Sequence, residues 1–117
     1  MIYSAAARTT GTFGRFLCTV REHHFVCDGP AFRGLPGEEV TPAEFFLTGV
    51  AACGVELIEV FAREEGLPLH SARCEIGADG RVASAGRTVF QSIRLEFTLE
   101  GVSDEHAAQL VERFEGT

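Results

Sequence analysis

Residues 41–53 read T-P-A-E-F-F-L-T-G-V-A-A-C, a stretch that predicts where a long helix begins. Thr41 and Glu44 form a T-x-x-E capping box, in which each side chain accepts a hydrogen bond from the other residue's backbone amide. Pro42 occupies the first helical position, where its fixed φ suits a helix and its missing N–H costs nothing. The sequence therefore predicts a helix that begins at Pro42.

This helix is expected to run to about Glu65, because Gly66 and Pro68 follow there. Its apolar residues form two stripes, one of Phe46, Val50, Cys53, Leu57 and Val60 or Phe61, the other of Leu47, Ala51, Gly54, Ile58 and Ala62. A helix with so wide an apolar surface is expected to be covered nearly all round. A single 117-residue chain offers little material for that, so we expect the same helix of a second subunit to supply the other wall. This predicts a homodimer.

The segments on either side of the helix are expected to be mostly strands. Before it, residues 2–7, 13–20 and 23–28 predict an antiparallel β-meander, followed by a loop rich in glycine and proline at residues 29–40. After it, alternating apolar residues predict strands around 70–76 and at 90–100.

Ser103 is expected to cap a final helix, with Asp104 and Glu105 in its first turn. The predicted fold is α+β: a β-meander, a long buried central helix, further strands and a C-terminal helix, in one domain over residues 1–117.

Composition excludes several classes of function. Ten arginines supply all the Lys and Arg, and there is no lysine, asparagine or tryptophan, so the chain has no Schiff-base lysine, P-loop lysine or N-glycosylation site. The net charge of −7 argues against a nucleic-acid partner. The first residues lack a secretory pattern, and the uncharged apolar stretch at 45–55 is too short for a bilayer. We therefore expect a cytoplasmic protein with no membrane partner.

The four cysteines match neither zinc-ligand nor C-x-x-C spacing: Cys18, Cys27, Cys53 and Cys74. If Val20 pairs with Phe25 across a four-residue turn, Cys18 falls opposite Cys27. For these two thiols we favour core filling over a disulfide, and Cys74 is expected in the core. The four histidines show no metal-binding spacing, so we expect neither a metal nor another cofactor.

Cys53 is the candidate nucleophile, although a small residue that eases helix packing is the alternative interpretation. It lies 12 residues beyond Thr41, which is about 18 Å along a helix. The positive end of the helix dipole acts only over the first turn, so it cannot activate this thiol. Any activating group must come from another segment.

Residues 33–65 resemble the OsmC/Ohr family of cysteine-based organic hydroperoxide reductases. The resemblance rests on the P-A-E-F-F-L start of the helix and on the A-A-C segment within it, and the order of elements agrees along nearly the whole chain. It implies an intertwined homodimer with each active site at the subunit boundary. It also implies that Cys53 is the peroxidatic cysteine, which a peroxide oxidises to a sulfenic acid.

A cation is needed to hold such a thiolate. Arg33 lies nine residues before Pro42, at the place where OsmC-type members carry an arginine. It is our candidate for stabilising both the thiolate and the peroxide. The alternative interpretation is that Arg33 is a solvated loop arginine. The first departure from the family concerns the residue that follows the proline. Ala43 follows the proline where the family has glutamate, and Glu44 is better explained by the capping box.

The second departure concerns the family's resolving cysteine, which lies in a C-P segment after the last helix. Cys18, Cys27 and Cys74 do not match that position, so we expect either that one of them substitutes or that an external thiol reduces Cys53. The predicted function is thiol-dependent reduction of small organic hydroperoxides in oxidative-stress defence. Two alternatives are a catalytically silent OsmC-like domain that binds a small apolar molecule near Phe45, Phe46 and Cys53, and a shortened protein whose dimer serves another partner.

Overall fold

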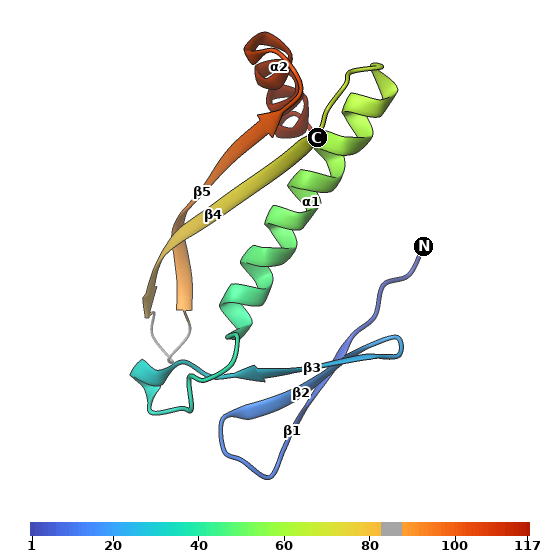
Figure 1. The fold of residues 1–117 in the computed structure, drawn as a ribbon. Coiled ribbons are helices and arrows are strands. Elements are labelled where there is room, and N and C mark those ends of the chain that lie inside the picture. Colours follow the sequence, from blue (N-terminus) through green and yellow to red (C-terminus); the bar gives the residue numbers. More distant parts are fainter. Residues whose placement is uncertain (83–87) are drawn as a thin grey trace. The chain divides into compact units, whose positions relative to one another are not determined.

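The computed structural model describes residues 1–82 and 88–117, which form two compact units. The first unit comprises Met1–Phe46 and the second comprises Leu47–Thr117. Figure 1 labels the elements of each unit along the chain.

The first unit contains the predicted β-meander. Strands β1 (Ala6–Thr9), β2 (Arg15–Val20) and β3 (His23–Asp28) form one antiparallel sheet in the order β1-β2-β3, followed by the short 3-10 helix η1 (Ala31–Arg33). The first strand begins four residues later than expected, and the residues before it are highly exposed. The order of the strands and the bounds of β3 are therefore confirmed, whereas β1 and β2 begin later than predicted.

The register between β2 and β3 differs from the prediction. Val20 pairs with His23, so only two residues form the turn, and the first of them, Arg21, adopts a φ of 54°. Cys18 therefore lies opposite Phe25, and the expectation that it lies opposite Cys27 is wrong by two residues. Because side chains alternate between faces with a period of two, this shift leaves both thiols on the same face of the sheet.

The second unit consists of a helix–hairpin–helix sequence. Helix α1 (Pro42–Glu64) begins in the first unit and continues into the second; it is followed by β4 (Ser71–Val82), β5 (Thr88–Glu100) and α2 (Asp104–Glu115). β4 and β5 pair antiparallel, with one irregularity between Asp79 and Gly80 (Figure 1). The predicted long helix and C-terminal helix are confirmed within one or two residues.

The core of the second unit joins α1 to α2 and the hairpin. Its buried residues are Ile58, Phe61, Ala62 and Leu110, and the half-buried residues packed on them are Leu57, Leu67, Leu69, Ala72, Phe97, Leu99, Val111 and Phe114. The second predicted stripe of α1 supplies most of the helix's buried residues. The first stripe is more open: Phe46 is 57% exposed and Val60 46%. Only one side of α1 is therefore covered by its own chain.

Helix α1 is long and apolar enough to meet the length and composition criteria of a membrane span. The uncharged stretch at residues 45–55 is only part of this helix, which has 23 residues, and the expectation of no membrane partner stays a prediction. Its C-terminal half carries a charged edge of Glu56, Glu59 and Arg63, while Ile58 and Ala62 on another side are buried in protein. We therefore describe the chain as soluble and α1 as its core helix.

Candidate functional site

Cys53 lies on α1 with an exposed side chain, next to a residue that is buried. That residue is Gly54, and a Cβ atom there would come within 2.9 Å of Phe97 on β5 and 3.5 Å of Phe114 on α2. Consecutive helical residues are rotated by about 100°, so the thiol lies to the side of the face that packs on β5. The close approach at Gly54 thus sets the orientation of the Cys53 side chain.

The helix neighbours of Cys53 are apolar except for Glu56, an exposed carboxylate three residues further along α1. Val50 and Leu57, one turn before and after the thiol, are half-buried, and Gly49 is exposed with nothing within 4 Å of where its Cβ would be. None of these neighbours is a cation that could stabilise a thiolate. Activation of Cys53 would thus need a group from another segment, as the sequence also implied.

The start of α1 confirms the predicted capping box. The Glu44 carboxylate accepts hydrogen bonds from the Thr41 amide at 2.9 Å and the Thr41 hydroxyl at 3.0 Å, and the Glu44 amide donates to Thr41 Oγ1 at 3.3 Å. The Thr41 amide and hydroxyl lower the pKa of the Glu44 carboxyl. This carboxylate is therefore used to start the helix, as predicted, and Ala43 stands beside it.

Arg33 is the last residue of η1, in the loop between β3 and α1. Gly34 caps that turn in the left-handed conformation at φ 76°, and its amide donates to the Ala31 carbonyl. The Arg33 guanidinium carbon lies 5.8 Å from the centroid of the Phe32 ring, near the upper limit for a cation–π contact. The side chain thus projects from a defined turn.

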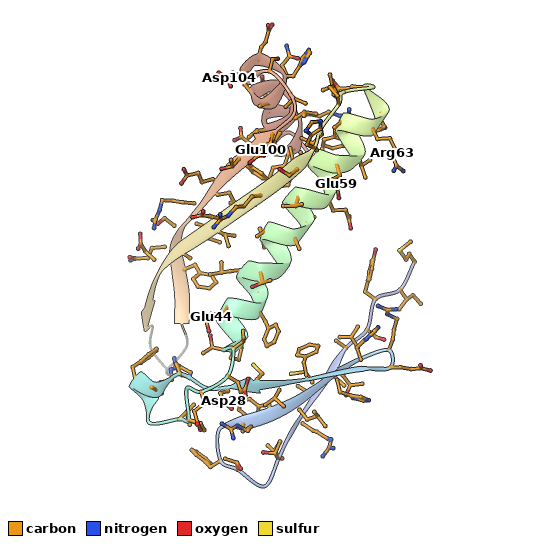
Figure 2. The ribbon with its side chains drawn as sticks, in the orientation of Figure 1. Asp28, Glu44, Glu59, Arg63, Glu100 and Asp104 are labelled. Carbon is orange, nitrogen blue, oxygen red and sulfur yellow. The ribbon has the colours of Figure 1, made fainter. Side chains whose placement is uncertain are left out.

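The loop that carries Arg33 is tied to the sheet by a buried carboxylate at the end of β3. The Asp28 side chain is fully buried; it accepts two hydrogen bonds from Arg15, at 2.7 and 2.9 Å, and one each from the amides of Glu38 and Glu39. These donors, Arg15 foremost, lower the pKa of Asp28 to about 2. Figure 2 labels Asp28 at this position.

Sequence reasoning missed Asp28. The available signal was an acidic residue at the end of a predicted strand and an arginine at the start of its neighbour. Asp28 and Arg15 are directly paired across β2 and β3, but this is evident only with the two-residue turn. With the predicted four-residue turn the two would not be opposite each other.

The first unit contains an apolar cavity of about 530 Å³ beside its sheet. Its lining residues are Ala5, Ala6, Ala7, Phe16, Cys18, Val20, Phe25, Cys27, Pro42 and Phe45. Phe25 and Phe45 are in contact, with ring centroids 4.8 Å apart. Cys27 is buried there, and burial, with the neighbouring Cys18 thiol, raises its pKa. The lining of this cavity suits an apolar ligand better than a charged one.

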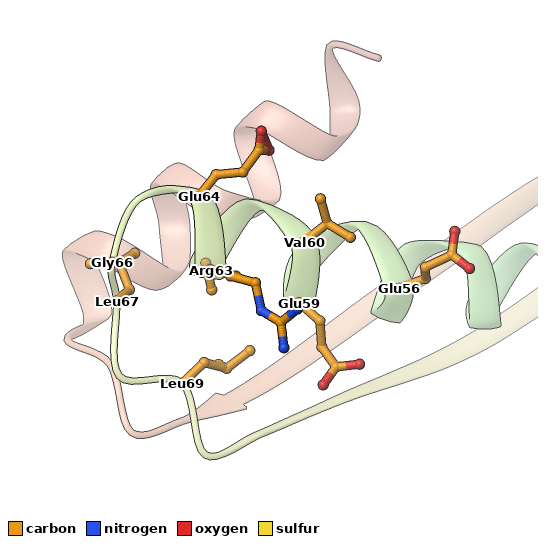
Figure 3. A pocket seen from close by; sticks show the side chains of 9 residues that line it. Glu56, Glu59, Val60, Arg63, Glu64, Gly66, Leu67 and Leu69 are labelled. Carbon is orange, nitrogen blue, oxygen red and sulfur yellow. The ribbon is translucent and has the colours of Figure 1, made fainter.

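The second unit has an open groove of about 760 Å³ at the C-terminal end of α1, drawn in Figure 3. Its rim carries Glu56, Glu59 and Glu64 beside Arg63, and its lining includes no cysteine. No group of three or more metal-ligating side chains occurs among the residues that the structure describes. The groove is therefore a charged surface feature that does not involve Cys53.

The remaining residues of the predicted site lie in different parts of the structure. Arg33 belongs to the first unit and Cys53 to the second, so their juxtaposition stays a prediction. Cys74 is half-buried in β4, where burial raises its pKa, so it is only partly in the core.

The fold and the thiol on α1 define an α+β protein with a helix-borne cysteine. The model of the OsmC-like protein family matches residues 35–116, and the chain therefore belongs to that family. A search of curated proteins finds no match.

Solved structures of similar proteins share the fold. An OsmC-like protein from Mycoplasma pneumoniae superposes with a TM-score of 0.81 at 13% identity, over 97% of this chain and 79% of that one. An organic hydroperoxide resistance protein from Elizabethkingia anophelis superposes with a TM-score of 0.77 at 17% identity, over 96% of this chain and 79% of that one. The organic hydroperoxide resistance protein OsmC from Legionella pneumophila superposes with a TM-score of 0.73 at 20% identity, over 96% of this chain and 80% of that one. At these identities the likeness establishes the fold.

Proposed function

We propose that this protein reduces small organic hydroperoxides, with Cys53 as the nucleophile, as part of oxidative-stress defence. The observation that carries the proposal is an exposed thiol on the central helix of a chain that belongs to the OsmC-like family. Solved structures that share its fold include proteins named for organic hydroperoxide resistance. Peroxides oxidise cysteines that are accessible to solvent and react as the thiolate.

The first chemical step is attack of the Cys53 thiolate on the peroxide O–O bond. The sulfur gains one oxygen and becomes a sulfenic acid, while the other oxygen leaves with a proton as an alcohol, so that one thiolate, one hydroperoxide and one proton are consumed. In this proposal the Arg33 guanidinium holds the thiolate and the peroxide oxygens. Arginine suits this role because it remains charged and presents several N–H donors in a fixed plane.

Recovery of the thiol requires a reductant, which we propose is an external thiol. One thiol condenses with the Cys53 sulfenic acid to give a mixed disulfide and water, and a second thiol releases Cys53. Burial raises the pKa of both Cys27 and Cys74, which lowers the fraction of reactive thiolate at neutral pH. These two thiols are therefore poor candidates for the resolving role.

The active form would be a cytoplasmic homodimer. The first apolar stripe of α1, which includes Cys53 and Val60, is open in the single chain. A second subunit that covers this stripe would enclose the thiol and exclude water from the reaction. A reducing compartment would keep all four cysteines as thiols.

The test is intact mass of the reduced protein before and after about one equivalent of cumene hydroperoxide, with dimedone present to trap sulfenic acid. We expect a rapid dimedone adduct on the wild type and on Cys74→Ser, and none on Cys53→Ser. The Cys74→Ser variant controls for the removal of a thiol elsewhere in the second unit. If Cys53 stays unmodified over minutes, the peroxidase proposal is wrong.

A second candidate function is binding of a small apolar molecule without turnover. The apolar cavity of about 530 Å³ in the first unit favours it, because the Phe25 and Phe45 rings form part of its wall. We would titrate the protein with 1-anilinonaphthalene-8-sulfonate and follow its fluorescence. Binding should weaken in Phe45→Ala and be unaffected in Phe13→Ala, whose side chain is 85% exposed. Equal binding by both variants would exclude this cavity.

A further inference from the structure

Residues 29–41 connect β3 to α1, and backbone hydrogen bonds hold the two ends of this segment together. The Asp28 amide donates to the Val40 carbonyl at 3.1 Å, and the Gly37 amide donates to the Gly29 carbonyl at 3.0 Å. The segment is therefore a closed loop whose base lies at the end of β3. Arg33 lies inside the loop that these two hydrogen bonds close.

The Asp28 carboxylate is the polar centre of this base. Oδ1 accepts from Arg15 Nε at 2.7 Å, and Oδ2 accepts from Arg15 Nη2 at 2.9 Å and from the amides of Glu38 and Glu39 at 3.0 and 3.1 Å. A buried carboxylate is stable only when such donors surround it, and every one of them comes from β2 or from the loop. The charge of Asp28 therefore ties the loop to the sheet.

A second attachment is apolar and lies closer to Arg33. The Leu35 side chain packs on the backbone of two glycines, since a Cβ atom on Gly29 would clash with Leu35 Cδ1 and one on Gly14 would come within 2.8 Å of Leu35 Cδ2. The Gly29 amide also donates to the Gly14 carbonyl at 2.8 Å. These contacts hold the turn that follows Arg33 against the β1–β2 connection.

We propose that Asp28, together with Arg15, is a positioning residue for hydroperoxide reduction, because it fixes the loop that carries the Arg33 guanidinium. This inference rests on the proposed function, in which Arg33 stabilises the thiolate and the peroxide. A cation that must meet a developing negative charge loses its effect when its placement varies by about 1 Å, at a cost of about 100-fold in rate. Asp28 thus contributes to catalysis through Arg33, without contacting the reacting atoms.

The experiment measures whether Asp28 determines the charge that Cys53 experiences. We would compare alkylation of Cys53 by anionic iodoacetate and by neutral iodoacetamide at low salt, with peptide mass spectrometry to report Cys53 alone. A cation beside the thiol accelerates the anionic reagent selectively. Arg33→Ala is expected to lower the ratio of the two rate constants about fivefold. Asp28→Asn is expected to lower it similarly, with no further decrease in the double variant.

Two further variants separate positioning from a general loss of structure. Glu38→Gln removes only the outer ion pair to Arg15, because the Glu38 side chain is 74% exposed and its amide still donates to Asp28. It should leave the ratio at the wild-type value. Arg15→Lys keeps the charge but cannot make both hydrogen bonds, so it should lower the ratio even if Asp28→Asn fails to fold.

The outcomes distinguish this inference from the proposed function. A wild-type ratio in both Asp28→Asn and Arg15→Lys, beside a lowered ratio in Arg33→Ala, would overturn the positioning role. A ratio that Arg33→Ala does not change would overturn the role of Arg33 and the positioning role with it. Absence of a sulfenic acid in the wild type would refute the peroxidase proposal, while the alkylation ratios would still decide whether Asp28 positions Arg33.

Discussion

The position that a Cβ atom would occupy on Gly54 lies 2.9 Å from Cζ of Phe97, between α1 and β5. Any other residue at position 54 would require a shift at this contact, where the Phe97 ring also meets Phe114 edge to face with centroids 5.4 Å apart. The residue after Cys53 is therefore the point of close approach between the helix and the hairpin. This contact turns Cys53 away from the core of its own chain.

Gly54→Ala should destabilise the protein. The added methyl group overpacks the contact with Phe97, which outweighs the gain in helix propensity and leaves a net loss of about 1 kcal/mol. Gly49→Ala is the matched control, because nothing lies within 4 Å of its added Cβ. That control should be stabilised by up to about 1 kcal/mol. Urea unfolding of both variants tests this, and a more stable Gly54→Ala would contradict it.

Acid should weaken the protein through Asp28. Folding lowers the pKa of Asp28 from 3.8 to about 2, chiefly through the hydrogen bonds from Arg15. The stability from this group is therefore fully present above about pH 4 and is lost as the pH falls from 4 toward 2. The urea midpoint measured across this range should differ between wild type and Asp28→Asn, and the difference should shrink on acidification. A constant difference would argue against the buried ion pair.

Thr41→Ala should cost about 1 kcal/mol in free energy of unfolding, because it removes the hydroxyl that accepts from the Glu44 amide. Glu44→Gln should cost less, since an amide oxygen can still accept from the Thr41 amide. It should also leave the rate of Cys53 oxidation close to wild type, because the carboxylate serves the cap. A large loss of oxidation rate in Glu44→Gln would instead give this residue a role in the reaction.

Arg113 joins the C-terminal ends of the two helices. Its guanidinium bonds to Glu65 at 2.9 Å and Glu64 at 3.1 Å, and its central carbon lies 3.9 Å from the centroid of the Phe61 ring. Arg113→Ala should therefore lower the free energy of unfolding by about 1–2 kcal/mol.

The control for Arg113 is Arg73→Ala. Arg73 pairs with Glu75 at 2.9 Å, but both side chains are well exposed, at 73% and 64%. Such a pair should contribute less than about 0.5 kcal/mol. Thermal unfolding of both variants gives the comparison, and equal losses would mean that the stacking on Phe61 contributes nothing.

Light scattering should give a mass of twice the 12.6 kDa chain, if a second subunit covers the open stripe of α1. Val60→Glu places a charge on that stripe, where the native valine is 46% exposed, and should shift the protein toward the monomer. Gln109→Glu adds the same charge on the exposed surface of α2 and should leave the mass unchanged. A monomeric wild type at tens of micromolar would contradict the dimer.

Much of this fold follows from local chemistry in the sequence. The capping box at Thr41 and Glu44 begins α1, and Ser103, which accepts from the His106 amide at 3.1 Å, begins α2. Alternating apolar and polar residues predicted the position of β5 and its antiparallel pairing. Each of these signals acts within a few residues, so the sequence contains it completely. The placement of Cys53 within a long apolar helix could also be predicted from such local signals.

Only the tertiary structure decided the contacts between distant residues. The two-residue turn at Arg21 set the register that pairs Asp28 with Arg15, and no local pattern distinguished it from a longer turn. Packing of Gly54 on Phe97 decided which side of α1 is buried, although both apolar stripes looked equally suited. Register and packing depend on the shapes of residues far apart in the chain, and a one-dimensional pattern does not encode how they meet.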